Sequence, residues 1–237
     1  MSKLGIYEYA HMIHRAWRYR LNTERDEVNF MLAQDLRGKT TLDIGANTGI
    51  YSYWMHKKVG RDGQVIGFEP QPEMIEHLQM VKDAFKMKNL TIAKTGLSSE
   101  IGSATLNRNL NHLGGASICR TIPGVNDSLT IPLTTLDAYL EENPCGQIAF
   151  IKCDVEGHEH EVIAGGMKTL ETHRPSLLIE CHDAQVHETA LFADLDSLGY
   201  NAYFFHQRAL TPMNRFDELR STIKDPFLNY VFVQDKK

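Results

Sequence analysis

"TLDIGANTGIYS", residues Thr41–Ser52, is the stretch that decides the fold of this chain. A short apolar run ends at Asp43, and Gly45 and Gly49 follow it before a helix-like segment begins. A glycine turn between a strand and a helix is typical of a ligand-binding loop in an open α/β sheet. The turn lacks the three glycines that face a pyrophosphate in dinucleotide-binding proteins, and a carboxylate beside it repels phosphate. The stretch therefore predicts a ligand that carries positive charge and no phosphate at this turn.

Strand-like and helix-like segments alternate after residue 40, which predicts parallel strands joined by crossover helices in a doubly wound, Rossmann-like α/β fold. The parallel strands are expected at residues 40–45, 64–70, 90–98, 147–155 and 176–182. The helices of this part are expected at residues 50–59, 72–85, 160–171 and 189–200. The last two strands, at residues 201–207 and 229–234, have no helix pattern between them. They predict an antiparallel C-terminal hairpin at the edge of a mostly parallel, seven-stranded sheet.

Two regions depart from this alternation. In the first, residues 1–36, apolar side chains recur at helical spacing, as in Ile6, Ile13 and Trp17, which predicts N-terminal helices. In the second, residues 106–130, no regular pattern is visible, and a long loop is expected. We expect a single domain over residues 1–237, in which residues 1–36 are a helical extension and residues 37–237 form the ligand-binding α/β core.

The bulk composition excludes several classes of partner. The formal net charge of −5 and the pI of about 6.1 argue against a nucleic-acid partner, whose binding depends on clustered Lys and Arg. No apolar run approaches the ~18 residues that cross a bilayer, so no membrane partner is expected. The four cysteines form no CxxC pair and are expected to be reduced. These features predict a soluble, cytoplasmic protein, and whether it is a monomer or a homodimer stays open.

The ends of the second and third strands narrow the choice of ligand. Glu69 ends the second strand, where a carboxylate can accept hydrogen bonds from both hydroxyls of a ribose. The Gly96–Leu97 step ends the third and can lie against an adenine. A cationic ligand with a ribose and an adenine describes S-adenosyl-L-methionine, and a nicotinamide or other nucleotide is the alternative. Tyr51 either covers the methionine part of the cofactor or packs in the core. The predicted cofactor contacts are Asp43, Gly45, Asn47, Gly49, Tyr51, Glu69, Pro70, Gln71, Gly96, Leu97 and Asp154.

A second group of polar residues follows the fourth and fifth strands and makes up the candidate catalytic set. Asp154, Glu156 and His158 follow the fourth strand, and Glu180 and His182 end the fifth. Because neighbouring parallel strands end at the same edge of a sheet, we expect Asp154 and Glu180 to lie together near the transferred methyl group. A hydroxyl acceptor must lose its proton, and an isolated carboxylate is a weak base. Two devices stay open: His158 or His182 as the base, or Mg²⁺ or Mn²⁺ held by Asp154, Glu180 and His182.

Together these motifs resemble the FkbM-type methyltransferases. The resemblance rests on DIGANTGIYS, FEPQP, NHLGGAS, TLDAYL, IKCDVEGHEHEVIAGG, PSLLIE and NYVFV, and it extends from about residue 40 to residue 233. It implies a class I S-adenosylmethionine-dependent transferase that methylates a hydroxyl of a sugar or another small natural product, as in natural product biosynthesis. It implies cofactor contacts at Asp43, Gly45, Asn47, Gly49 and Glu69, and a reaction site lined by Asp154, Glu156 and Glu180.

Other functions stay open beside O-methylation of a small molecule. A non-catalytic S-adenosylmethionine-binding protein needs the glycine turn but not the acids that follow the fourth and fifth strands. A protein or peptide methyltransferase is a further alternative, in which the acceptor binds the N-terminal helices. Methylation of a base amine is not expected, because residues 154–157 lack the Asp/Asn-Pro-Pro-aromatic run common in such enzymes. The segment from Asn111 to Ser117, with its two glycines, is expected to form a wall of the acceptor site.

Overall fold

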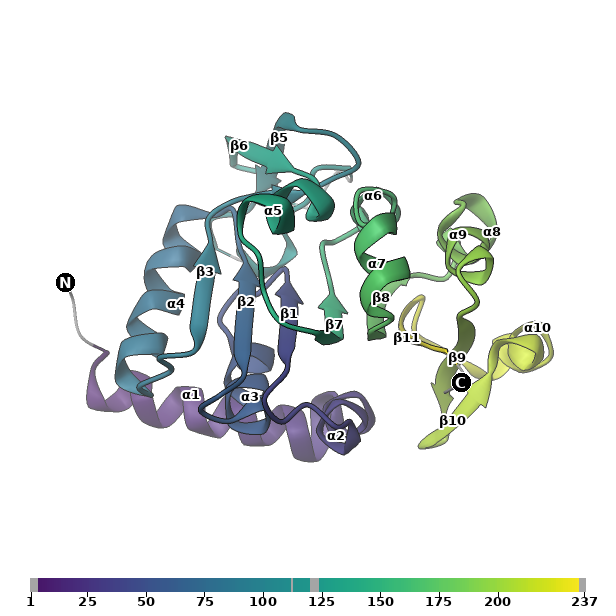
Figure 1. The fold of residues 1–237 in the computed structure, drawn as a ribbon, viewed down its shortest axis with the longest axis horizontal. Helices are drawn as coiled ribbons and strands as arrows, with labels where there is room; N and C mark the ends of the chain where they lie inside the picture. Colours follow the sequence, from purple (N-terminus) through teal and green to yellow (C-terminus); the bar gives the residue numbers. More distant parts are fainter. Residues whose placement is uncertain (1–3, 112, 120–123, 235–237) are drawn as a thin grey trace. The chain divides into compact units, whose positions relative to one another are not determined.

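The computed structural model describes residues 4–111, 113–119 and 124–234. The chain divides into two compact units. Unit 1 comprises residues 1–96 and 144–152, and unit 2 comprises residues 97–143 and 153–237. Unit 1 therefore contains the glycine turn, and unit 2 contains the candidate catalytic residues (Figure 1). The single-domain organisation expected from the sequence stays a prediction.

Unit 1 is built on a sheet with the strand order β7-β1-β2-β3. The strands are β1 (Thr40–Ile44), β2 (Gln64–Phe68), β3 (Leu90–Ala93) and β7 (Ile148–Cys153). β1 and β2 pair in parallel, as do β2 and β3, so that Thr41 lies opposite Val65 and Gly67 opposite Ile92. All five residues of β1 are buried, as is usual for strands of parallel sheets, whose two faces are both covered. This part of the predicted alternation is confirmed.

Helices of unit 1 come from both its N-terminal segment and its strand connections. They are α1 (Ile6–Arg18), the π-helical turn η1 (Tyr19–Thr23), α2 (Arg25–Ala33), α3 (Ile50–Val59) and α4 (Pro72–Ala84). The predicted N-terminal helices are therefore present. In α1, however, the apolar residues at helical spacing do not mark the side of the helix that is buried. Met12 and Ala16 are the buried residues of α1, whereas Ile6 is 92% exposed. The indole of Trp54 in α3 donates a hydrogen bond to the carbonyl of Ala16 at 3.1 Å, which ties α1 to α3.

Unit 2 contains an antiparallel set of strands in the order β8-β11-β9-β10 and a separate three-stranded sheet in the order β4-β6-β5. The first set is β8 (Ser176–His182), β9 (Asn201–His206), β10 (Ala209–Pro212) and β11 (Phe227–Val233). The second is β4 (Gly96–Leu97), β5 (Gly102–Arg108) and β6 (Asp127–Thr134). All seven predicted strands are thus found in the described part of the chain, and the antiparallel C-terminal pairing of β9 with β11 is confirmed.

The segment between β9 and β11 is more regular than the sequence suggested. It forms the extra strand β10, in which Leu210 pairs with Phe205, and then a run of helical turns at residues 213–222. The short helix α10 (Phe216–Leu219) is held by one buried aromatic side chain, Phe216, which stacks edge-on against Phe204. The prediction that no helix lies here was therefore wrong. The sequence did not reveal this helix because a single anchoring residue produces no periodic apolar pattern.

Two further predictions are corrected around the second sheet of unit 2. The predicted strand at residues 90–98 is divided, since β3 ends at Ala93 and β4 belongs to the other sheet. The predicted loop at residues 106–130 begins and ends in regular structure, because β5 and β6 pair antiparallel. Their pairing buries a small apolar cluster of Leu106, Ile131 and Leu133. Among the described residues between these two strands, the structure adds a short 3-10 helical turn, η2 (Leu113–Gly115).

The helices of unit 2 are mostly short. They are α5 (Leu136–Glu142), α6 (Glu159–Ala164), α7 (Met167–His173), α8 (Gln185–Glu188), α9 (Leu191–Ser197) and α10. The predicted helix at residues 160–171 is interrupted between α6 and α7 at Gly165 and Gly166. A Cβ atom on Gly165 would lie 2.0 Å from the carbonyl oxygen of Ser98, so only glycine allows this close approach.

Two expectations drawn from composition can be compared with these elements. In the part of the chain that the structure describes, no helix combines the length and the apolar character that a membrane span requires. Among the described residues, none of the four cysteines forms a disulfide, and Cys153 and Cys181 are buried in strands β7 and β8.

Candidate cofactor loop and acidic pocket

The glycine loop between β1 and α3 is a tight turn with three residues in the left-handed region. Gly45 and Gly49 each have φ 81°, and Asn47 has φ 47°. Left-handed backbone is readily adopted by glycine and tolerated by asparagine, which explains these residue types. A Cβ atom on Gly49 would lie 2.5 Å from Cδ1 of Leu78, so this glycine also allows α4 to pack closely.

The backbone amides of this loop are used within unit 1. The amides of Gly45 and Ala46 both donate to the carbonyl of Phe68, at 3.1 and 2.9 Å, and the amide of Gly49 donates to Ala46 at 2.8 Å. The amide of Asn47 donates to Oε2 of Glu69 at 2.9 Å. A phosphate-binding loop instead directs such amides at its ligand. The loop geometry therefore argues against a pyrophosphate and agrees with the prediction made from Asp43.

Glu69 is a buried carboxylate that the backbone fixes from two sides. Its Oε2 accepts from the amide of Asn47 and its Oε1 from the amide of Gln71, both at 2.9 Å. Burial raises the pKa of Glu69 to about 7, although the hydrogen bonds from Gln71 and Asn47 oppose this rise. A carboxylate has about four lone-pair positions, and the two amides together with the Gln71 side chain use three of them, so Glu69 keeps capacity for a further donor. Its role as the acceptor for the ribose hydroxyls of S-adenosylmethionine stays a prediction.

Asp43 has a structural partner that the sequence did not suggest. It is buried at the end of β1, and its Oδ2 accepts a hydrogen bond from the hydroxyl of Ser52 at 2.6 Å. Ser52 is fully buried in the first turn of α3. Asp43 thus ties the strand before the glycine loop to the helix after it, and it shapes the loop in addition to its predicted role beside a cationic cofactor.

Tyr51 links the glycine loop to the N-terminal segment of unit 1. Its hydroxyl donates to Oε2 of Glu24 at 2.6 Å, and Nζ of the buried Lys152 lies 5.4 Å from the centre of its ring. Burial raises the pKa of the neighbouring Glu27 to about 7, and the attraction of Lys152 opposes that rise. Sequence reasoning missed Glu24, Glu27 and Lys152, because only the fold brings the turn before α2 to the end of β7.

The remaining predicted cofactor contacts lie at two strand ends. Gln71 is buried and precedes α4, and Pro70 separates it from Glu69. Gly96 and Leu97 form β4, in which Leu97 is buried. Their part in adenine binding stays a prediction.

Unit 2 gathers four carboxylates around one small pocket. Its lining residues are Asp154, Glu156, Gly157, Glu159, Glu180, Cys181 and Phe227. Three of the predicted catalytic acids are therefore brought together, and Glu159 is a member that sequence reasoning missed. Across the described residues, no group of three or more His, Cys, Asp or Glu side chains is arranged to hold a metal ion, so the predicted metal site is not supported.

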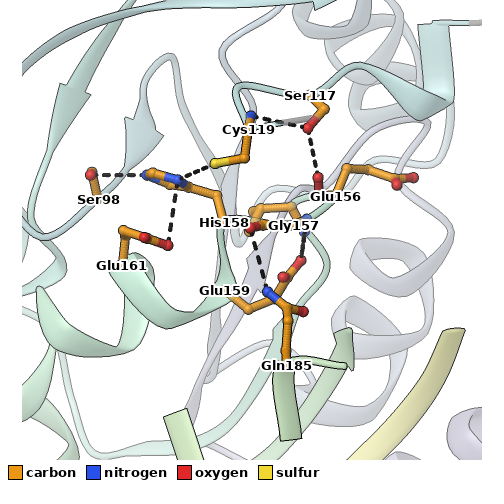
Figure 2. Close-up of polar contacts among 10 residues, drawn as sticks. Ser98, Ser117, Cys119, Glu156, Gly157, His158, Glu159, Glu161 and Gln185 are labelled. Atoms are coloured by element: carbon orange, nitrogen blue, oxygen red, sulfur yellow. Dashed lines mark hydrogen bonds and ion pairs between the residues drawn. The ribbon is translucent and has the colours of Figure 1, made fainter. Parts of the chain in front are cut away.

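The turn that carries Glu156 is strained and held by its neighbours (Figure 2). Glu156 has φ 58°, a conformation that costs a glutamate energy, and Gly157 follows with φ 106°. Oε1 of Glu159 accepts from the amides of Val155 and Gly157, at 3.2 and 3.0 Å. The hydroxyl of Ser117 donates to the carbonyl of Glu156 at 2.7 Å. The segment predicted as an acceptor wall thus contacts the turn through Ser117.

His158 lies outside the lining of the acidic pocket. Figure 2 shows its ring between two other side chains, with Nε2 3.0 Å from the hydroxyl of Ser98 and Nδ1 3.1 Å from the sulfur of Cys119. Burial lowers its pKa, and Glu161, whose Oε2 is 3.5 Å from Nδ1, opposes that shift. The neutral ring is therefore favoured, and both of its nitrogens have partners within unit 2.

His182 lies at the end of β8, with 42% of its side chain exposed. Its Nδ1 lies 3.1 Å from the amide nitrogen of Ala184 and 3.0 Å from Oδ1 of Asp183. Gln185 connects this strand end to the strained turn, because it contacts both the amide of His182 and the carbonyl of Gly157. The structure thus joins His182 to the turn through Gln185, although His182 does not line the pocket.

A glycine loop with internally satisfied amides, followed by a buried acid after the next strand, is the arrangement expected of S-adenosylmethionine-dependent methyltransferases with a Rossmann-like fold. The sequence pattern of the Methyltransferase FkbM domain matches residues 43–225, and the chain belongs to this family. The resemblance noted from the sequence motifs is thereby confirmed.

Comparison with individual proteins agrees with this assignment. The chain is 26% identical over 171 residues to the hexuronic acid methyltransferase AglP of Haloferax volcanii, which covers 72% of this chain and 67% of that protein. It superposes on an FkbM methyltransferase of Methylobacillus flagellatus with a TM-score of 0.52 at 15% identity, covering 84% of this chain. The chain spans only 45% of that protein's length.

A second solved structure extends the likeness in fold. A Clostridium thermocellum protein described as an rRNA methylase gives a TM-score of 0.57 at 10% identity, over 91% of this chain and 97% of that one. At such low identity the two structural comparisons establish the fold alone. They confirm the predicted mixed α/β, Rossmann-like class.

Proposed function

We propose that this chain transfers a methyl group from S-adenosylmethionine to a hydroxyl of a sugar or another small natural-product acceptor. The observation that carries the proposal is the pocket in which Asp154, Glu156 and Glu180 meet. Carboxylates accept hydrogen bonds and protons, which is what a hydroxyl must give up as its oxygen attacks. The similarity to a hexuronic acid methyltransferase supports a carbohydrate-like acceptor.

The cofactor is held by unit 1 in this proposal. Glu69 accepts hydrogen bonds from the ribose, the loop of Gly45, Asn47 and Gly49 gives room for the methionine part, and Asp43 adds a negative charge. S-adenosylmethionine supplies an electrophilic methyl group when it is bound. Pro70, Gln71 and Gly96 complete the contacts that unit 1 is proposed to make with the adenosine part.

Among the acids of unit 2, Asp154 and Glu180 are proposed to orient the acceptor hydroxyl and take its proton. His182, whose Nδ1 is occupied, is the candidate to pass the proton to solvent, and His158 positions the turn through Ser98 and Cys119.

The charge of the chain supports a small acceptor over RNA. A protein that binds a nucleic-acid backbone relies on clustered cations, whereas this chain has a net charge of −5 and an acid-lined pocket. The similarity in fold to an rRNA methylase does not change this, because it is a likeness of architecture at 10% identity.

Incubation of the full chain with methyl-labelled S-adenosylmethionine and a panel of glycosides tests the proposal. We expect a labelled methyl ether on at least one glycoside, with release of S-adenosylhomocysteine and no loss of activity in EDTA. The variant Asp154→Asn should abolish ether formation, whereas the exposed Glu100→Gln in the same unit serves as the matched control. Cofactor binding without ether formation on any acceptor would favour the non-catalytic alternative. Loss of activity in EDTA would restore the metal-dependent mechanism.

A further inference from the structure

Glu159 is the side chain of the acidic pocket with an unfilled hydrogen-bonding position. The residue is fully buried at the start of α6. Its Oε1 is occupied by the amides of Val155 and Gly157, but its Oε2 is buried and has no hydrogen-bond partner among the described residues. A buried carboxylate oxygen without a donor is costly, so a small donor that enters the pocket would stabilise this position.

The pocket itself restricts what that donor can be. It has room for one water-sized group and not for a whole sugar ring. Besides Glu159, its polar side chains are mainly the carboxylates of Asp154, Glu156 and Glu180, and its described lining contains no Lys, Arg or His. Because these three acids also take part in other interactions, Glu159 is the member with an open acceptor. The occupant must therefore be small, rich in donors and preferably cationic.

Three kinds of group are compared with these demands. A carboxylate, as in a hexuronic acid, offers no donor when ionised and is repelled by the acids of the pocket. A divalent metal ion needs several ligands arranged around one point, which the described His, Cys, Asp and Glu side chains do not provide. A protonated amine is the size of a water molecule, carries one positive charge and donates three hydrogen bonds. Of the three, only the amine meets every demand.

We propose that this pocket binds the protonated amine of the acceptor, and that the acceptor is an amino sugar whose amine lies beside the hydroxyl to be methylated. The inference rests on the function proposed above and adds the class of substrate. It differs from what the name of the Haloferax volcanii relative indicates, since a hexuronic acid carries the opposite charge.

The same contact explains why the amine would not be methylated itself. Neighbouring carboxylates raise the pKa of an ammonium group, because they stabilise its charged form. A protonated nitrogen has no lone pair with which to attack a methyl group. The hydroxyl beside it keeps its lone pairs and can give its proton to a carboxylate. An amine held by Glu159 therefore directs the methyl group to oxygen.

Substrate selectivity of the unmodified chain is the first test, and it needs no variant. The substrates are the methyl glycosides of glucosamine, N-acetylglucosamine, glucose and glucuronic acid, compared by kcat/KM near neutral pH. We expect the amine to exceed its N-acetyl derivative by about tenfold or more, with the glucuronide the poorest, since a charge-assisted hydrogen bond distinguishes them. Equal rates, a preference for the glucuronide, a preference that disappears in EDTA, or a methyl group found on nitrogen would each overturn the proposal.

The variant Glu159→Gln is the second test, read as the ratio of kcat/KM for the amine to that for its N-acetyl derivative. We expect the ratio to fall from about ten toward one, whereas Glu100→Gln keeps it. A purely structural role of Glu159 would lower both rates together and leave the ratio unchanged, which would contradict the proposal.

Binding without turnover separates this inference from the proposed function. The full chain saturated with S-adenosylhomocysteine is titrated with the amine and with the N-acetyl glycoside, and binding is followed by NMR. Tighter binding of the amine, by about tenfold, supports the inference even if no methyl ether forms, in which case the proposed function alone has failed. Methyl ether formation with equal binding of the two glycosides would mean that the proposed function holds and that the inference about the amine has failed.

Discussion

Buried carboxylates occur in both units, but the two units hold them differently. In unit 1, both oxygens of Glu69 are fixed by backbone amides, and Asp43 is fixed by the hydroxyl of Ser52. In unit 2, Glu159 is fixed through one oxygen, and the other faces no donor among the described residues. The first arrangement shapes the loop that is proposed to receive the cofactor. The second leaves an acceptor position on a residue that lines the acidic pocket, where we propose that the substrate binds.

The largest effect is expected from the acids of unit 2. Glu180→Gln removes a proton acceptor from the pocket while it keeps the shape of the side chain. We expect kcat to fall by about 10²–10³-fold, the usual contribution of a general base. Steady-state kinetics on the best acceptor measure this, with Glu100→Gln as the control. A fall in cofactor affinity of similar size would mean that Glu180 acts on the cofactor instead.

In unit 1, substitution of Glu69 is expected to act on binding. Glu69→Ala removes the acceptor for the amides of Asn47 and Gln71 and for the ribose. We expect the affinity for S-adenosylhomocysteine to fall by about 100-fold, since charged hydrogen bonds contribute roughly 1.5–3 kcal/mol each. Calorimetric titration measures the change, and the exposed Asp62→Asn in the same unit is the control. Unchanged affinity would remove Glu69 from the cofactor site.

The raised pKa of Glu69 should make the free energy of unfolding depend on pH. Burial raises this pKa from 4.5 to about 7, so between these values the folded chain holds a proton that the unfolded chain has lost. Its contribution to stability is therefore present at low pH and lost as the pH rises toward 7, by about 2 kcal/mol between pH 5.5 and pH 8. Urea unfolding of the wild type and of Glu69→Gln checks this, because the variant should lack that part of the slope. If the free energy of unfolding of the wild type and of Glu69→Gln changed equally with pH, the raised pKa of Glu69 would be contradicted.

The affinity for the cofactor is expected to increase with pH, whereas the contribution of Glu69 to stability decreases. Ribose hydroxyls donate best to the ionised carboxylate, so the affinity should increase as the pH rises through about 7. Titration in buffers of different ionisation enthalpy should show a proton released on binding. No proton release near neutral pH would mean that Glu69 is already ionised in the free chain or does not meet the ribose.

The smallest effect is expected at Ser52, which acts on the cofactor only through Asp43. Ser52→Ala leaves the buried Asp43 without that donor and should lower the free energy of unfolding by about 1–2 kcal/mol. The exposed Ser103→Ala is the matched control, and thermal unfolding measures both. A loss of stability no greater than that of the control would show that Asp43 does not depend on Ser52.

Sequence reasoning was most successful where structure depends on local pattern. The strand, the glycine turn and the acid at the end of the next strand follow one another along the chain, so the positions of Asp43 and Glu69 in the fold could be predicted, while their role toward the cofactor stays a prediction. It failed where a contact depends on the fold. Glu24 meets Tyr51 across 27 positions, and the need for glycine at position 165 depends on the nearby carbonyl oxygen of Ser98.

Glu159 shows a different limit of the sequence. It lies in the same motif as Asp154 and Glu156, but its polar neighbours gave no sign that it would be buried. Its importance depends on which oxygen has a partner, and no residue pattern contains that information. The same holds for His158, whose partners Ser98 and Cys119 come from distant segments.

Product analysis after reaction of the full chain with S-adenosylmethionine and methyl glucosaminide is the most direct measurement. We expect one methyl group on the oxygen next to the amine, located by NMR of the purified product, with one S-adenosylhomocysteine formed for each methyl transferred. A methyl group on nitrogen, or cofactor binding with no methylated glycoside of any kind, would contradict an O-methyltransferase whose acidic pocket holds the acceptor.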